Sequence, residues 1–149
     1  MLAQVGEYLI RHGYPRTWEH SLAVAMQARI LAQRFGVDEN RAQLAAWLHD
    51  ISAVIPDSER LAAALRYQLE VLPEEAAYPL ILHQKLSLVL AQQEFGVNDE
   101  GVLSAIGCHT TLKAQFSKLD LVLFVADKLA WDQPGEAPFA PAMRAGLAV

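Results

Sequence analysis

Alanine and leucine fill 46 of the 149 positions, 24 and 22 respectively, and this excess limits the possible folds more than any other feature of the sequence. Both residues are among the best helix formers, and neither is a strong signal for a β-strand. Charged residues make up only 19% of the chain, so the helices should bury broad apolar faces against one another. A chain of this size buries roughly 70% of its unfolded surface, enough for one core without disulfides. The sequence therefore predicts an all-α protein.

Glycine, proline and capping residues divide the chain into about seven predicted helices. Gly13 and Gly36 should end the first two, and Pro79 should break or kink the fifth. Asp38 and Asn98 are the predicted N-caps of the third and sixth helices. The predicted helices cover approximately residues 2–12, 16–35, 39–52, 56–69, 73–96, 99–109 and 117–131.

The last part of the chain is rich in proline and alanine. We predict that residues 1–133 form the domain and that 134–149 form a tail. Four helix breakers should prevent regular structure in this tail: Pro134, Gly135, Pro138 and Pro141.

The charge balance and the apolar runs exclude two classes of partner. Asp and Glu number 17 against 12 Lys and Arg, and the net charge of −5 argues against a nucleic-acid groove. The longest unbroken apolar run, residues 121–126, is far shorter than the ~20 residues that span a bilayer. We therefore predict a cytoplasmic protein without a nucleic-acid or membrane partner.

Several polar side chains fall on segments that are otherwise apolar. His20, for example, lies at helical spacing with Val24 and Leu31, on the face that should be buried. Burying one such group without a partner costs about 1–3 kcal/mol, and an ionised carboxylate costs more. The full set is His20, His49, Asp50, His83, His109 and Asp127. Each could make a separate hydrogen bond, but one shared metal site would satisfy all six.

The residue types narrow the choice of metal site. A single cysteine provides no thiolate cage, and histidine with carboxylate suits iron, manganese or zinc. The Glu-x-x-His motif of helical di-iron proteins and the His-Glu-x-x-His motif of zinc proteases are both absent. His49 and Asp50 are neighbours, and neighbours on a helix diverge by about 100°. The pair can therefore serve one metal at a helix end, or Asp50 can reach a second.

The order of these six residues resembles the HD phosphohydrolase superfamily. The local phrases are similar to its YqeK group, whose members are symmetrical diadenosine tetraphosphate hydrolases, also described as HD hydrolases linked to NAD metabolism. The resemblance covers about residues 16–131. The phrases that carry it are Arg16-x-x-x-His20-Ser21-x-x-Val24, Leu48-His49-Asp50-Ile51-Ser52, Ile81-Leu82-His83, His109-Thr110-Thr111 and Ala126-Asp127-Lys128.

The resemblance implies an HD-domain helical bundle around a binuclear centre, commonly of iron, with manganese or zinc as alternatives. One metal would be held by His20, His49, Asp50 and Asp127, and Asp50 would bridge to a second held by His83 and His109. His49 and Asp50 would form the catalytic pair. A metal-bridging hydroxide would attack an inner phosphorus of a dinucleoside tetraphosphate, releasing two nucleoside diphosphates.

Four residues are candidates for contacts to substrate phosphates. Arg16 lies one turn before His20, and Lys128 follows Asp127. Thr110 and Thr111 follow the last histidine of the motif. Solvation at the surface explains the two cations equally well, and the threonines could simply end a helix. A nucleoside monophosphate phosphatase, a phosphodiesterase and a weakly catalytic nucleotide-binding module remain alternatives.

The chain departs from the family pattern in several places. Ala53 stands where the family usually has Lys, and Gln84 and Leu112 stand where it usually has Gly. The loss of the Lys removes a cation that could neutralise phosphate. Residues 128–133 lack the usual Glu-Pro-x-Arg, and the final helix of the family is expected to be missing, because of truncation or because the branch is short. A homodimer is a further expectation.

Overall fold

The computed structural model describes residues 1–148, and this part of the chain contains helices and turns but no strand. This confirms the all-α prediction. Three short 3₁₀ helices are η1 (Ile51–Val54), η2 (Asp57–Glu59) and η3 (Pro79–Leu82). The α-helices are α1 (Leu2–Arg11), α2 (Pro15–Phe35), α3 (Glu39–Leu48), α4 (Arg60–Arg66), α5 (Pro73–Ala77), α6 (His83–Gln93), α7 (Glu100–Gly107), α8 (Lys118–Leu129) and α9 (Ala140–Leu147).

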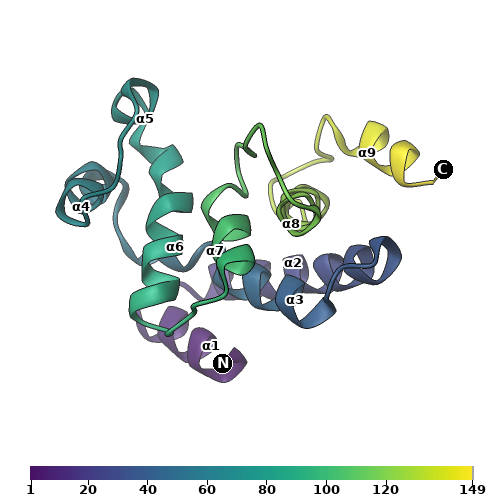
Figure 1. Cartoon of the computed structure of the whole chain (residues 1–149), viewed down its shortest axis with the longest axis horizontal. Coiled ribbons are helices and arrows are strands. Elements are labelled where there is room, and N and C mark those ends of the chain that lie inside the picture. The colour runs from purple at the N-terminus through teal and green to yellow at the C-terminus, as the bar shows by residue number, and fades with distance from the viewer. Residues whose placement is uncertain (149) are drawn as a thin grey trace.

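The main core forms where α2 runs along α3 and α8, and α7 packs against α3, α6 and α8 (Figure 1). Small side chains let helix backbones approach closely, which explains part of the alanine excess. Alanines of α2 and α3 are almost fully buried in this core: Ala25, Ala28, Ala32, Ala42, Ala45 and Ala46. A smaller cluster joins α4 to η3 and α6 through Ala63, Ala64, Leu82 and Leu86. None of the helices in residues 1–148 is both long and apolar enough to cross a bilayer.

The helix ends follow local sequence signals closely. Gly36 adopts φ +66 after α2, and the Asp38 side chain accepts a hydrogen bond from the Arg41 N–H at the start of α3. The predicted cap Asn98 is wrong by one residue, because Asp99 accepts the hydrogen bond from the Val102 N–H. Asp99 also binds the Arg41 guanidinium, and this ion pair links α3 to the start of α7.

The structure corrects the predicted number and extent of the helices. The predicted third helix ends at Leu48 rather than Ser52, because the chain turns at His49 and Asp50 and continues as η1. The fourth begins as the 3₁₀ turn η2 and ends at Arg66. The break at Pro79 is confirmed, since α5, η3 and α6 occupy the predicted fifth helix.

The prediction of an irregular tail is also wrong. Helix α9 occupies Ala140–Leu147 and packs against α8, at the far end of the molecule from α4 and α5 (Figure 1). Pro141 lies in its first turn, where the missing N–H needs no partner in the helix. Ala140, the first residue of α9, is buried. The proline that was expected to prevent a helix is therefore placed where a helix accepts it.

Candidate metal centre

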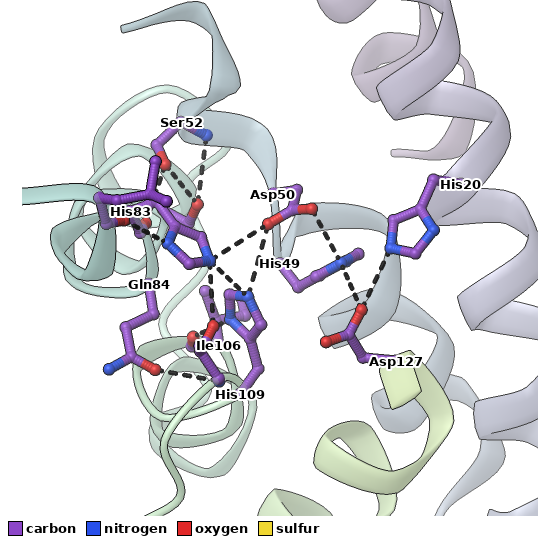
Figure 2. A network of polar contacts seen from close by, with 12 residues as sticks. His20, His49, Asp50, Ser52, His83, Gln84, Ile106, His109 and Asp127 are labelled. Atoms are coloured by element: carbon purple, nitrogen blue, oxygen red, sulfur yellow. Dashed lines mark hydrogen bonds and ion pairs between the residues drawn. The ribbon is translucent and has the colours of Figure 1, made fainter. Parts of the chain in front are cut away.

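The six polar residues singled out from the sequence meet in one place, which we name the His/Asp cluster. Figure 2 shows the side chains converging from five separate segments. His20 lies on α2, His49 and Asp50 directly follow α3, and His83 is the first residue of α6. His109 follows α7 at its C-terminal end, and Asp127 lies on α8. The turn that ends α3 early thus carries the two adjacent members.

One part of the cluster, the His20 side, consists of His20, His49 and Asp127. His20 Nε2 lies 3.1 Å from Asp127 Oδ1. His49 Nε2 lies 3.6 Å from the same oxygen. Lys128 Nζ donates to the other oxygen, Asp127 Oδ2, at 2.7 Å. Asp127 therefore presents one oxygen to two imidazoles and the other to an ammonium group.

The other part, the His83 side, consists of His83 and His109. Their Nε2 atoms lie 3.1 Å apart, and the two rings are nearly perpendicular at 73°. His109 is buried, and the His83 side chain is 20% exposed. Two ring nitrogens therefore face the same small volume.

Asp50 stands between the two sides, and its two oxygens face in different directions (Figure 2). Oδ2 lies 3.3 Å from His49 Nε2. Oδ1 lies 3.6 Å from His83 Nε2 and 3.4 Å from His109 Nε2. One carboxylate is thus shared by both sides of the cluster.

Three of the histidines are held by the same local contact. Nδ1 of His49 donates to the Ala46 carbonyl at 2.7 Å, three residues earlier. His83 Nδ1 donates to the Leu80 carbonyl at 2.7 Å, and His109 Nδ1 to the Ile106 carbonyl at 2.8 Å. A carbonyl only accepts, so Nδ1 carries a proton and Nε2 faces the cluster. This is how metal-binding histidines are commonly oriented.

The charges of the cluster shift the pKa values of its members in opposite directions. Burial lowers the pKa of His49, but Asp50 and Asp127 outweigh burial and hold it well above its usual value. Burial raises the pKa of Asp50 and of Asp127, but neighbouring histidines hold both well below their usual range. Burial and the adjacent His109 lower the pKa of His83 to about 4. The carboxylates are therefore ionised and available as ligands at neutral pH.

The donor set suits a divalent cation. His49 Nε2 is fully buried and makes no hydrogen bond, although it faces two carboxylate oxygens. Two groups of three have ligand atoms within 4.8 Å of one another, and they share one residue: His20, His49 and Asp50, and Asp50, His83 and His109. Imidazole with carboxylate fits iron, manganese and zinc. A cation would satisfy the buried nitrogen and balance the carboxylates.

The predicted substrate-binding residues lie in different environments. Arg16 is exposed in the first turn of α2. Lys128 is held by Asp127, and its Nζ also lies 4.8 Å from the centre of the Phe124 ring. Thr110 Oγ1 lies 3.0 Å from His83 Nε2, whereas Thr111 Oγ1 accepts a hydrogen bond from Gln84.

Two neighbours of the cluster received no role from the sequence. Gln84 is 4% exposed and binds the segment that follows His109. Its only signal in the sequence is that it replaces a family glycine. Asp132 Oδ2 lies 3.7 Å from His20 Nδ1, the one Nδ1 atom of the four cluster histidines without the carbonyl contact described above. Periodicity gave no signal for Asp132, because it lies beyond the end of α8.

Comparison with known proteins gives consistent results. The family described as "HD domain" matches residues 17–132. A protein of Lactococcus lactis subsp. cremoris, described as an uncharacterized protein in the pepC 5′ region, is 45% identical over 113 residues, 76% of this chain and 58% of that protein. The symmetrical bis(5′-nucleosyl)-tetraphosphatase of Bacillus subtilis (strain 168) is 34% identical over 128 residues, 85% of this chain and 65% of that enzyme.

Solved structures include a similar fold. The crystal structure of a predicted HD superfamily hydrolase involved in NAD metabolism, from Clostridium acetobutylicum, superposes with a TM-score of 0.88 at 25% identity. The match covers 98% of this chain and 76% of that one. The present chain spans 58% to 65% of the length of the two curated relatives.

Proposed function

Because this chain belongs to the HD domain family, we propose that it is a metal-dependent phosphohydrolase of nucleotides. The reaction that we favour is the symmetrical cleavage of dinucleoside tetraphosphates, in which diadenosine tetraphosphate gives two ADP. The observation that carries the proposal is the convergence of four histidine Nε2 atoms and two carboxylates in the His/Asp cluster. The name of the Bacillus subtilis relative supports the choice of substrate.

We propose that two divalent ions occupy the cluster, iron first, with manganese or zinc as alternatives. The His20 side and Asp50 would hold one ion, and the His83 side and Asp50 the other. The separate directions of the Asp50 oxygens support this sharing. Such ions would supply Lewis-acid stabilisation of phosphate oxygens and activation of water.

The chain's own residues would bind and orient the phosphates. Lys128 holds Asp127 Oδ2, so that Oδ1 keeps its position against His20. The Thr110 hydroxyl lies 3.0 Å from His83 Nε2, within reach of a phosphate bound beside the His83 side. Arg16 is exposed one turn before His20 and suits a bidentate contact with a phosphate.

Three further predictions concern the domain bounds, the cellular location and the oligomeric state. We propose that residues 1–133 form the HD domain, since the family match ends at 132 and all six cluster residues precede it. A cytoplasmic location, predicted from the short apolar runs of the sequence, and a homodimer are two further proposals. Measurement of the molar mass in solution tests the homodimer.

The decisive experiment combines metal analysis with a substrate screen. The chain is purified without a chelator, its metal content is measured, and it is assayed with diadenosine tetraphosphate, mononucleotides and cyclic nucleotides. We expect about two equivalents of metal and ADP as the only nucleotide product. His49→Ala should abolish both results, whereas His12→Ala should change neither, because His12 is exposed outside the cluster.

Other outcomes would redirect or overturn the proposal. Release of phosphate from mononucleotides, or opening of cyclic nucleotides, would favour the phosphatase or phosphodiesterase alternative. Metal without turnover of any of these substrates would favour a nucleotide-binding module. If the wild-type protein contains no metal and His49→Ala folds as well as the wild type, the proposed metal centre is overturned.

A further inference from the structure

The segment that carries His109 leaves its helix in a tight turn. Helix α7 ends at Gly107, and the Leu112 N–H donates to the Cys108 carbonyl at 2.8 Å. Leu112 adopts φ +57, a left-handed conformation that is uncommon for residues other than glycine. A turn of this kind needs partners for the backbone N–H groups of its inner residues.

Gln84 supplies these partners from the neighbouring helix. Its Oε1 accepts hydrogen bonds from the Thr110 N–H at 3.0 Å and the Thr111 N–H at 3.4 Å. Its Nε2 donates to Thr111 Oγ1 at 3.0 Å. One buried amide thus satisfies both backbone donors and a hydroxyl of the turn.

The placement of Gln84 connects the two histidines of the His83 side. Gln84 follows His83 directly in the first turn of α6, and the residues that it binds follow His109 directly. The His83 and His109 Nε2 atoms are 3.1 Å apart, so a small shift of either segment changes the distance between them. Gln84 also fixes the backbone of Thr110, whose Oγ1 lies 3.0 Å from His83 Nε2.

We infer that Gln84 is a positioning residue that fixes the spacing of His83 and His109 for a divalent cation on the His83 side. It acts through the turn at Thr110 and Thr111 and contacts no ligand atom itself. This inference rests on the metal centre proposed above. Partners that orient metal ligands from outside the coordination sphere typically change metal affinity by about 10–100-fold when they are lost.

The inference predicts an asymmetric effect. The side-chain hydrogen bonds of Gln84 go to the turn after His109, whereas His20 and Asp127 lie on α2 and α8. Loss of the amide should therefore weaken one metal equivalent and leave the other unchanged. A residue that merely stabilised the fold would weaken both or neither.

The test is a calorimetric titration of the metal-free protein with Mn²⁺, which the same donor set accepts. Gln84→Ala should raise the Kd of one equivalent by about 10–100-fold and leave the other Kd unchanged. His83→Ala identifies the affected equivalent, because it should remove the same one. Gln84→Glu should recover most of the affinity, since a carboxylate accepts the same two N–H groups. Gln92→Ala, exposed on the same helix, is the matched control.

The Mn²⁺ titration either supports or overturns the role of Gln84. Selective weakening by Gln84→Ala, with rescue by Gln84→Glu and no effect of Gln92→Ala, supports the inference. Equal weakening of both equivalents, or no change in either, overturns it while leaving the metal centre intact. A wild-type chain that binds no Mn²⁺, Fe²⁺ or Zn²⁺ overturns the proposed metal centre and this inference together, and is distinguished by the wild-type titration alone.

Discussion

The two sides of the His/Asp cluster each supply two histidines but are held in different ways. On the His83 side both ring Nδ1 atoms donate to backbone carbonyls, and Gln84 joins the two segments. On the His20 side, His20 Nδ1 is buried without a hydrogen bond, and Asp127 Oδ2 accepts a hydrogen bond from Lys128 Nζ. Backbone carbonyls hold both histidines of the His83 side, whereas on the His20 side they hold only His49, and the side chains of Asp127 and Lys128 position the rest.

The two sides also differ in their preference for a proton. Burial acts on His49 and His83 in the same sense, lowering the pKa of both. His49 faces Asp50 and Asp127, which raise its pKa well above the usual value, whereas the neighbouring His109 lowers the pKa of His83 further, to about 4. A cation must therefore displace a proton from His49 but finds His83 already neutral. Because burial acts in the same sense on both histidines, the neighbouring charges account for the difference between their pKa values.

The largest effect is expected from Asp50→Asn, which breaks both sides at once. The amide keeps the shape of the side chain but removes the negative charge that both sides share. We expect both metal equivalents to be lost and hydrolysis to fall by about 10³-fold or more, since metal ions supply several kcal/mol of barrier reduction. Metal analysis and steady-state kinetics measure this, with exposed Glu94→Gln as the control. Retention of both equivalents would contradict a shared carboxylate.

The next prediction separates the sides. His20→Ala and His83→Ala should each remove one metal equivalent and keep the other, because each side has its own imidazoles. Hydrolysis should fall at least about 10²-fold in both, since loss of even an outer partner of a metal site costs 10–100-fold. Titration with Mn²⁺ counts the remaining equivalents, with His12→Ala as the control. If either substitution removes both equivalents, the two sides form one unit.

The sequence predicted the all-α class and the meeting of six polar residues at one site. It did not predict the lengths of the helices. Alanine-rich stripes identify which face is buried, since periodicity is a property of the local sequence. The early end of α3 at Leu48 depends on His49 and Asp50 turning into the cluster, and that is decided by contacts with other helices. Helix α9 is hidden in the sequence because a proline breaks the interior of a helix but fits its first turn, where Pro141 lies.

The sequence indicates the residues of the cluster, because they are polar residues on apolar faces. It does not indicate the residues that hold them in place. His49 and His109 are polar residues at positions where the pattern predicts buried apolar ones, so they can be identified from the sequence, and both are buried. Gln84 binds residues 26 and 27 positions away, and Asp132 lies near His20 only because the chain turns after α8. Contacts between residues so far apart in the chain produce no periodic pattern in a single sequence.

The third prediction concerns the pH dependence of the metal-free protein. The pKa of His83 is about 4 in the folded chain, below its unfolded value of about 6.5. Between these values the unfolded chain binds a proton that the folded chain refuses, so the free energy of unfolding falls as the pH decreases from 6.5 to 4. We expect this contribution to be about 1–3 kcal/mol.

His83→Gln should remove that contribution, because glutamine does not titrate. Urea unfolding of both proteins in a chelator, across this pH range, gives the difference between their stabilities. His49 should behave in the opposite way, since its raised pKa supplies stability that is lost as the pH rises through the folded value. Equal slopes for the wild type and His83→Gln would contradict the contrast between the two sides.

The smallest effect is expected from Asp132→Asn, which tests whether the His20 side has its own outer support. Asp132 Oδ2 lies 3.7 Å from His20 Nδ1, but its side chain is 55% exposed, so water and salt screen the interaction. An exposed ion pair contributes up to about 1 kcal/mol, so the affinity for Mn²⁺ on the His20 side should fall about 2–5-fold.

The effect of Asp132→Asn should shrink at high salt and spare the equivalent on the His83 side. Glu136→Gln is the matched control, because Glu136 is exposed nearby in the chain and binds Arg144 instead. A loss as large as that of His20→Ala would make Asp132 a metal ligand in its own right. No loss at any salt concentration would leave His20 oriented by Asp127 alone, and the His20 side would then be the less constrained half of the cluster.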